Sequence, residues 1–216
     1  MSRINVFLNK ILAGGLTAGA LLLAAPMSAH SAPKTVLVLG DSLSAEYGLA
    51  RGSGWVALLD QKLKADKVDA TIVNASISGE TTIGGRTRLP ALMTQYRPAV
   101  VVIELGANDA LRGLPLPAAE ANLRAMVDAA QAGHAKVLLV GMRMPPNYGR
   151  AYTDRFFAMF KTVATSEKTA LVPFMLDGVA EQASMFQADR LHPVAAAHPT
   201  ILANIFPSIL TLIKSR

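Results

Sequence analysis

The segment Val36-Leu37-Val38-Leu39-Gly40-Asp41-Ser42-Leu43-Ser44 decides how this chain of 216 residues folds. Its aliphatic half predicts a buried strand, and Gly40-Asp41 predicts a turn directly after that strand. A serine at the carboxyl end of a first parallel strand lies at the edge where open α/β sheets bind their ligands. Ser42 is therefore a candidate nucleophile, although Gly-Asp-Ser on its own fits an ordinary turn equally well.

Outward from this segment, strand-like and helix-like patterns alternate along the chain. Aliphatic and β-branched runs predict strands at 35–39, 70–74, 99–105, 136–141 and 170–175. Apolar residues at helical spacing predict helices at 55–65, 86–95, 117–132, 152–165 and 194–213. We expect the last helix to be bent or interrupted near Pro199 and Pro207, because proline lacks a backbone donor. The alternation predicts one α/β domain with a mostly parallel five-stranded sheet between two layers of helices.

The N-terminus has the pattern of an export signal. Basic residues precede an apolar run at 11–25, and small residues follow it. We expect cleavage after Ser31, leaving residues 32–216 as the mature domain, located in the periplasm or secreted. The alternative is an uncleaved membrane anchor, but the run is shorter than the roughly 18–20 residues that span a bilayer.

Composition narrows the classes of partner. The chain has no cysteine, so it forms no disulfides, and removal of Arg3 and Lys10 with the signal lowers the formal charge from +6 to +4. No basic block is present, which argues against nucleic-acid binding and leaves at most a mild attraction to anionic lipid surfaces. The sequence shows no metal-ligand cluster, dinucleotide fingerprint or phosphate-binding loop, so we expect neither a metal nor a cofactor.

Polar segments follow the predicted strands at 40–42, 74–82, 106–109 and 189–193, where simple turns would otherwise suffice. Asp189 and His192 are three residues apart, a spacing that lets the carboxylate contact the imidazole Nδ1–H while Nε2 faces a serine. Acyl transfer also needs donors for the oxyanion. The candidates are the Ser42 N–H, the Gly79 N–H and the side-chain amide of Asn108.

Other polar residues near these segments are expected to have structural roles. Asp41 should brace the turn after the first strand, and Asp109 should hold the loop of Asn108. Asp154 and Asp177 could also orient a histidine, but neither has the short spacing of Asp189. His134 and His198 are expected at the surface.

The four segments resemble the four sequence blocks of the SGNH (GDSL) hydrolase family, with Ser42, Gly79, Asn108 and His192 at the block positions. They are closer still to the bacterial periplasmic thioesterase I type, which also acts as a lysophospholipase and arylesterase. The resemblance extends over essentially the whole mature chain. It implies a flavodoxin-like α/β/α sandwich, a Ser42–His192–Asp189 triad, and an oxyanion hole formed by Ser42, Gly79 and Asn108.

Three positions depart from the family pattern: Glu46, Ala110 and Arg190. None of them removes a catalytic atom, but each borders the site, so they bear on substrate preference.

The segment after the fourth strand supplies Met144, Pro145 and Tyr148 as candidate substrate-binding residues. It is either an apolar loop that covers an acyl chain or an ordinary proline-rich connection.

These features predict a monomeric, exported serine esterase that hydrolyses acyl esters and thioesters, with lysophospholipids among its candidate substrates. One alternative is a deacetylase of cell-wall or polysaccharide sugars. The other is a non-catalytic lipid- or carbohydrate-binding protein.

Overall fold

The computed structural model describes residues 33–215 of the chain, so the predicted signal peptide at 1–31 lies outside the described residues. Within that range five strands form one sheet: β1 Lys34–Gly40, β2 Ala70–Asn74, β3 Val100–Glu104, β4 Lys136–Val140 and β5 Ala170–Val172. The helices are α1 Trp55–Ala65, α2 Thr82–Tyr96, α3 Ala107–Leu111, α4 Leu116–Ala132, α5 Arg150–Ser166 and α6 His198–Lys214. Short 3₁₀ turns are η1 Pro146–Tyr148, η2 Ala183–Met185 and η3 Ala195–Ala197.

All strand pairs are parallel, and the strand order is β2-β1-β3-β4-β5. The chain adds β2 on one side of β1 and then continues from β3 on the other side. This reversal makes the carboxyl ends of β1 and β3 the topological switch point, where open α/β sheets form a ligand crevice. The predicted flavodoxin-like fold is confirmed.

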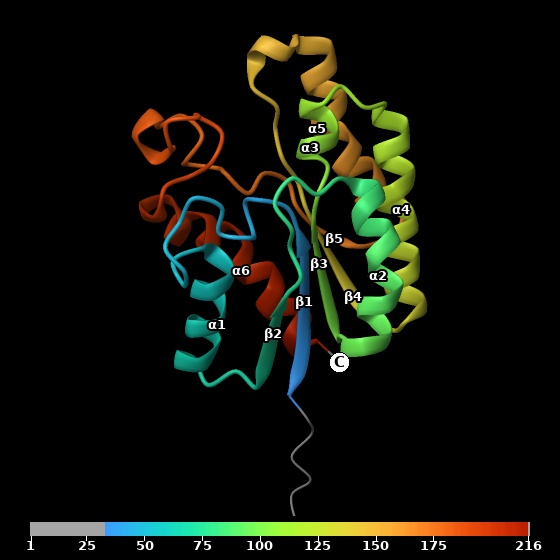
Figure 1. Cartoon of the computed structure of the whole chain (residues 1–216). Coiled ribbons are helices and arrows are strands. Elements are labelled where there is room, and N and C mark those ends of the chain that lie inside the picture. The colour runs from blue at the N-terminus through green and yellow to red at the C-terminus, as the bar shows by residue number, and fades with distance from the viewer. Residues whose placement is uncertain (1–32, 216) are drawn as a thin grey trace, which may run out of the picture. The chain divides into compact units, whose positions relative to one another are not determined.

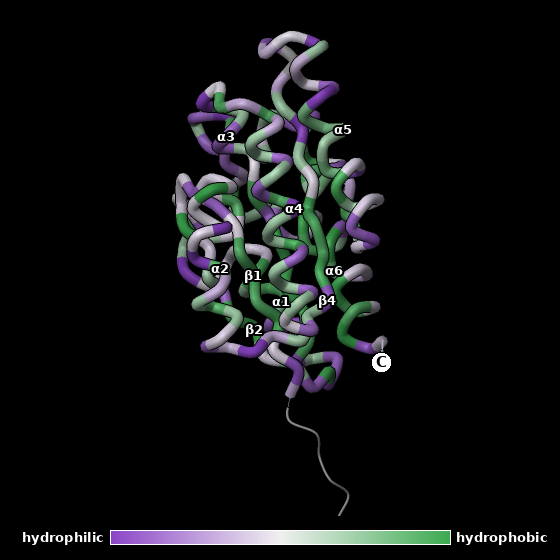
Figure 2. The backbone as a smooth tube through the Cα atoms, turned by 90° about the vertical axis from the view of Figure 1, so that its right-hand side faces the viewer, coloured by the Kyte–Doolittle hydropathy of each residue, from purple (hydrophilic) through white to green (hydrophobic). Residues whose placement is uncertain are grey.

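Helices cover both faces of the sheet. In Figure 1, α1 and α6 lie on one side, and α2, α4 and α5 lie on the other. The strands and the inner helix faces are hydrophobic, while hydrophilic residues line the outer turns (Figure 2). Every residue of β3 is buried, as expected for a central strand with helices on both faces.

One described stretch, Ala195–Lys214, is long and apolar enough by composition to cross a membrane. In this fold one face of the helix packs into the hydrophobic core. Ile201, Ile205 and Ile209 of α6 are fully buried, and the helix packs against α1, β4 and β5.

The structure corrects three predicted boundaries and adds the short helix α3, which the sequence did not predict. α6 begins at His198 and not at 194, since Ala195–Ala197 form the separate 3₁₀ turn η3. β5 ends at Val172 and does not reach 175, because Pro173 follows and has no N–H for the ladder. α2 begins at Thr82 and not at 86, so it includes two glycines that the helical pattern had left out. A Cβ on Gly85 would lie 2.3 Å from Leu105 Cδ1, so glycine here allows the helix to approach the sheet closely.

The terminal helix also differs from the prediction. α6 is uninterrupted across Pro207, and Pro199 occupies the first turn, where a missing N–H breaks no hydrogen bond. His198, expected at the surface, is only 1% exposed. Its Nδ1 accepts the Trp55 N–H at 2.9 Å, which supplies a partner for the first turn of α1. Burial lowers the pKa of His198, so the neutral form that accepts this bond is favoured.

Candidate active site

The turn after β1 holds Ser42 in a closely packed backbone. A Cβ on Gly40 would lie 2.7 Å from Ser44 Oγ and 2.8 Å from Glu104 Oε2, so only glycine fits there. Asp41 Oδ1 accepts the Leu43 N–H at 3.0 Å, which confirms the predicted bracing of the turn. Ser42 is thereby presented at the carboxyl edge of the sheet.

Asn108 lies on α3, the short helix that directly follows β3. Its Nδ2 donates to Asp41 Oδ2 at 2.9 Å, which joins the two sides of the switch point. One amide hydrogen is used in this bond, and the second is left for a substrate oxygen. Asp109 accepts from both the N–H and the hydroxyl of Thr82, at 2.8 and 2.5 Å, so it holds the Asn108 helix against α2 as predicted.

A second carboxyl group lies beneath this turn. Glu104, at the end of β3, is 2% exposed, and its Oε2 accepts from the Ser44 hydroxyl at 2.8 Å and the Asp41 N–H at 3.3 Å. Burial, together with the neighbouring Asp41 carboxylate, raises the pKa of Glu104 well above its usual value. Burial also raises the pKa of Asp41 to about 6. Burial therefore favours the protonated form of Glu104 beside Asp41.

Ser42, His192 and Asp189 form a continuous chain of contacts. Ser42 Oγ lies 2.9 Å from His192 Nε2, and His192 Nδ1 lies 2.6 Å from Asp189 Oδ2. Asp189 Oδ1 also accepts the N–H groups of Leu191 and His192. These backbone bonds and the imidazole contact lower the pKa of Asp189 to about 2. The ionised carboxylate can only accept, so Nδ1 carries the proton and Nε2 is free to take one from Ser42.

Gln187 connects the loop that contains His192 to the loop that contains Ser42 through hydrogen bonds. Its Nε2 donates to the Tyr47 carbonyl at 2.9 Å and to the Pro193 carbonyl at 3.1 Å. Its backbone N–H donates to the His192 carbonyl at 2.8 Å. The Tyr47 ring lies over the imidazole, with ring centroids 4.4 Å apart. Two segments 140 residues apart are thus joined beside the Ser42–His192 contact.

Gly79 lies on the loop after β2, which also approaches the serine turn. The Asn74 side chain donates to the Ser44 carbonyl at 2.8 Å, and the Ile77 N–H donates to the Gly40 carbonyl at 3.0 Å. Gly79 has a φ of +79°, which glycine adopts without strain, and its carbonyl accepts from Arg112 at 2.8 Å. The structure therefore brings the loop of Gly79 to the site, although Gly79 is not among the residues that line the cavity.

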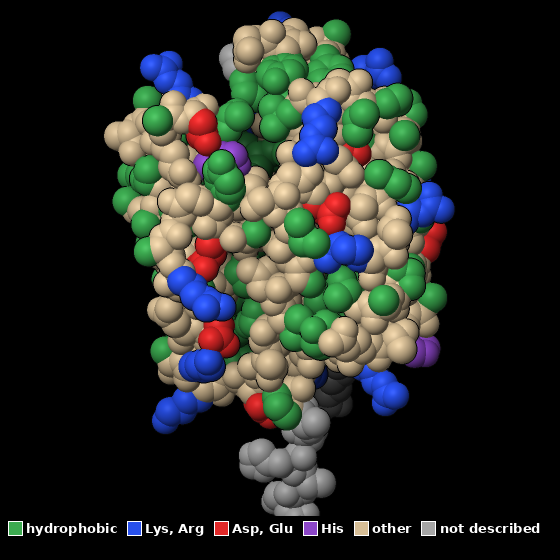
Figure 3. Space-filling view, viewed as in Figure 1, with side chains coloured by type: hydrophobic (Ala, Val, Ile, Leu, Met, Phe, Trp, Pro, Cys, Tyr) green, Lys and Arg blue, Asp and Glu red, His purple; other side chains and the backbone are tan. Residues whose placement is uncertain are grey.

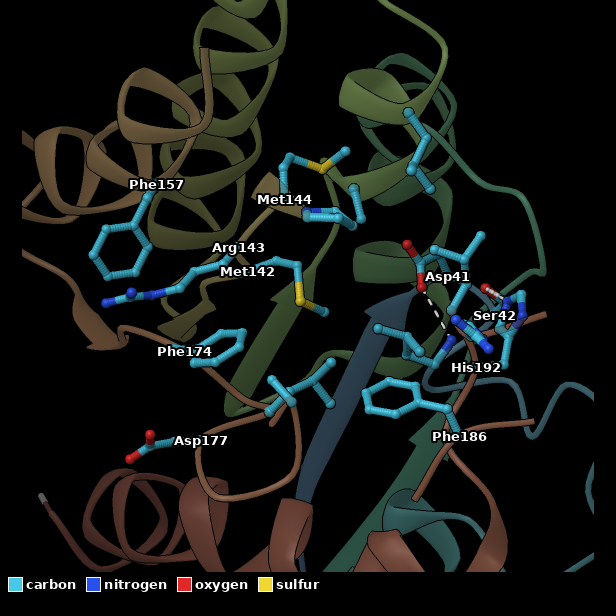
Figure 4. A pocket seen from close by; sticks show the side chains of 18 of the residues that line it. Asp41, Ser42, Met142, Arg143, Met144, Phe157, Phe174, Asp177, Phe186 and His192 are labelled. Carbon is cyan, nitrogen blue, oxygen red and sulfur yellow. Dashed lines mark hydrogen bonds between the residues drawn. The ribbon is translucent and has the colours of Figure 1, made fainter. Parts of the chain in front are cut away.

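A cavity of about 890 Å³ opens beside Ser42, Asn108 and His192. Its walls are mainly apolar and include Leu43, Leu111, Met142, Met144, Pro145, Phe157, Phe174, Leu176 and Phe186. Met142 and Met144 lie between Ser42 and His192 on one side and a far wall where Arg143 stacks on Phe157 (Figure 4). The Arg143 guanidinium carbon is 4.0 Å from the Phe157 ring centroid and 5.4 Å from that of Phe174.

Of the three candidate substrate-binding residues, Met144 and Pro145 line this cavity and Tyr148 does not. Asp177 lines it too, but the carboxylate in contact with His192 is that of Asp189. Arg190, one of the departures from the family pattern, is also on the cavity wall.

Sequence reasoning missed Gln187, Glu104 and Arg143. A role for Glu104 could have been predicted from the sequence, because a charged residue at the end of an otherwise aliphatic strand needs a buried partner. No sequence pattern predicted the roles of Gln187 and Arg143, since these roles depend on contacts with segments that are distant in the chain. Within residues 33–215, no group of three or more His, Cys, Asp or Glu side chains could hold a metal ion.

This fold and this site together define a serine ester hydrolase. The chain matches the GDSL-like lipase/acylhydrolase family over residues 38–199 and belongs to that family. The esterase TesA of Pseudomonas aeruginosa is 49% identical over 187 residues, which cover 87% of this chain and 93% of that protein. The thioesterase 1/protease 1/lysophospholipase L1 of Escherichia coli K12 is 40% identical over 171 residues, covering 79% of this chain and 81% of that protein.

Solved structures agree with these sequence matches. The crystal structure of TesA aligns with a TM-score of 0.81 and 50% identity, covering 83% of this chain and 99% of that one. The psychrotrophic esterase EstA from Pseudoalteromonas sp., inhibited by monoethylphosphonate, aligns with a TM-score of 0.80 and 42% identity. That alignment covers 84% of this chain and all of the EstA chain.

Proposed function

We propose that the protein hydrolyses acyl esters and thioesters through a Ser42–His192–Asp189 triad and a covalent acyl-enzyme. The observation that carries the proposal is the chain of contacts from Ser42 Oγ to His192 Nε2, 2.9 Å, and from His192 Nδ1 to Asp189 Oδ2, 2.6 Å. Both distances are within the hydrogen-bond reach that proton transfer from the serine to the histidine requires.

In the first half-reaction, Ser42 Oγ attacks the acyl carbonyl carbon while His192 Nε2 takes the hydroxyl proton. The carbonyl oxygen becomes an oxyanion, which receives hydrogen bonds from the Asn108 amide and the N–H groups of Ser42 and Gly79. The C–O or C–S bond to the leaving group then breaks, and His192 passes its proton to the departing alcohol or thiol. Asp189 stabilises the imidazolium during this step.

In the second half-reaction, water attacks the acyl carbon of the Ser42 ester. His192 Nε2 takes a proton from the water and returns it to Ser42 Oγ as the acyl–enzyme bond breaks. The acid is released and the resting enzyme is restored, so no cofactor enters the cycle.

The cavity walls support the proposed substrate class. Two methionines, Met142 and Met144, and several aromatic side chains offer adaptable apolar contacts for an acyl chain. The names of the relatives include arylesterase and lysophospholipase, which supports esters of aromatic alcohols and of lysophospholipids as substrates. We further propose export, with cleavage after Ser31 and a monomeric mature enzyme.

The test combines a phosphonate probe with a chain-length series. Purified protein should become labelled at Ser42 by a fluorophosphonate, Ser42→Ala should not, and nitrophenyl esters of medium or long acids should be hydrolysed. Absence of labelling would support the non-catalytic alternative and overturn the proposal. Hydrolysis of acetyl esters alone would support a sugar deacetylase. Mass spectrometry of the exported protein should show Ala32 at the N-terminus.

A further inference from the structure

The large apolar side chains that are most exposed to solvent all lie at one edge of the described domain. Each is in a loop, a short helix or a first helical turn that follows the carboxyl end of a strand. They are Tyr47, Ile77, Ile83, Leu114, Tyr148 and Leu191. We call this set the apolar rim. Figure 3 shows hydrophobic side chains gathered around a hollow beside a histidine on this part of the surface.

Most of the apolar rim is not explained by the catalytic site. Only Leu191 lines the cavity, and Tyr47 packs on the imidazole of His192. Ile83 and Leu114 are 53% and 38% exposed and line no part of the cavity. Exposed apolar side chains that gather in one region and have polar neighbours are typical of a protein or membrane contact surface.

The charged residues of the same loops indicate whether this surface contacts a protein or a membrane. Their cations are all arginines, Arg51, Arg112, Arg143, Arg150 and Arg190, and the lysines of the described chain lie elsewhere. A guanidinium binds phosphate oxygens in a bidentate manner. The exposed carboxylates of Asp177 and Glu181 lie among them, so the edge carries charges of both signs. Phosphate-binding groups, mixed charge and an apolar rim fit a zwitterionic phospholipid surface.

We propose that the apolar rim docks the enzyme on the surface of a zwitterionic phospholipid aggregate, with the cavity facing the lipid. A monoacyl lipid then passes from the aggregate into the cavity without crossing bulk water. Leu191 belongs to both the rim and the cavity wall, and Tyr47 of the rim packs on His192, so the docking surface adjoins the site of hydrolysis. This inference rests on the proposed acyl-ester hydrolase function.

The test uses two double variants at Ile83 and Leu114, which take no part in the catalytic site. In the first, Ile83→Ser and Leu114→Ser remove the apolar contact. In the matched control, Ile83→Leu and Leu114→Ile preserve it. Binding is measured by sedimentation with phosphatidylcholine vesicles that contain lysophosphatidylcholine. Hydrolysis is measured on that vesicle-bound lipid and on a soluble short-chain nitrophenyl ester.

We expect the serine variant to bind vesicles about tenfold more weakly, because two half-exposed aliphatic side chains no longer enter the lipid. Hydrolysis of the vesicle lipid should fall in parallel, while hydrolysis of the soluble ester stays unchanged. The control variant should match the wild type in all three measurements. Failure of the wild type to sediment with vesicles, or equal binding by the serine variant, would overturn the inference.

A dimer in solution that the serine variant dissociates would also overturn it, since the rim would then be an interface between two copies of the chain. The Ser42→Ala protein separates this inference from the proposed function. Its vesicle binding should be intact even though its hydrolysis is lost, so binding and catalysis are tested independently.

Discussion

Replacement of Asp189 by asparagine separates the charge of the proposed triad acid from its role in the loop. Asp189 Oδ1 accepts two backbone N–H groups, and Oδ2 faces His192 Nδ1 at 2.6 Å. In Asp189→Asn the amide oxygen can keep both backbone bonds, so the loop should remain folded. The amide NH₂ would then face Nδ1 and favour the tautomer with its proton on Nε2, which cannot accept the proton of Ser42.

The expected loss in kcat follows from this change of tautomer and from the exposure of the carboxylate. A buried triad aspartate is worth about 10⁴-fold in kcat when it is changed to asparagine. The Asp189 side chain is 38% exposed, so solvent screens part of its charge. We therefore expect a loss of about 10³-fold, equal to roughly 4 kcal/mol of barrier.

The assay is steady-state hydrolysis of a nitrophenyl ester, with thermal unfolding measured in parallel. Asp189→Asn should unfold within a few degrees of the wild type, whereas Asp189→Ala should also lose the two backbone bonds and unfold at a lower temperature. Asp154→Asn is the matched control, because that carboxylate is 71% exposed and pairs only with Arg150 among the described residues. A kcat for Asp189→Asn close to that of the control would refute the assignment of the triad acid.

Three further predictions concern the residues around the proposed triad. Asn108→Ala should lower kcat by roughly 100-fold or more with little change in KM, through loss of an oxyanion donor; an unchanged kcat would mean that the donors lie elsewhere. Gln187→Ala removes two side-chain hydrogen bonds, one to Tyr47 in the serine loop and one to Pro193 within the histidine loop, worth about 1 kcal/mol each. It should lower the unfolding free energy by about that sum in urea titration and lower kcat more than it raises KM, and a change in KM alone would contradict a positioning role. Burial raises the pKa of Asp41 from 3.8 to about 6, so the folded state holds this proton more tightly than the unfolded chain does. The stability this provides is complete below pH 3.8 and is lost as the pH rises through 6. Asp41→Asn should therefore flatten the pH profile of the unfolding free energy between pH 3.8 and 6. An unaltered profile would mean that other groups cause the loss of stability in this range.

Much of the architecture could be predicted from local sequence. The aliphatic runs before Gly40 and Gly106 mark the central strands, because only a strand covered on both faces is continuously apolar. Where the prediction failed, long-range packing had overridden local preference. Gly85 weakens a helix in isolation, yet it lies inside α2 because the helix must approach Leu105. His198 appeared to be a surface residue, because nothing near it in sequence revealed that α6 would place it against Trp55.

The amino-acid sequence by itself predicted the alternation of the five strands with the five longer helices, though not the short helix α3. It also identified Ser42, Asn108, Asp189 and His192 as the candidate reacting groups. Their types and short spacings are local properties of the chain. Only the tertiary structure decided that Gln187 joins the two loops, that Glu104 supports the serine turn, and that Arg143 stands at the far wall of the cavity. Those roles depend on contacts between segments far apart in the chain, and such contacts exist only after the parallel sheet has brought the strand ends to one edge.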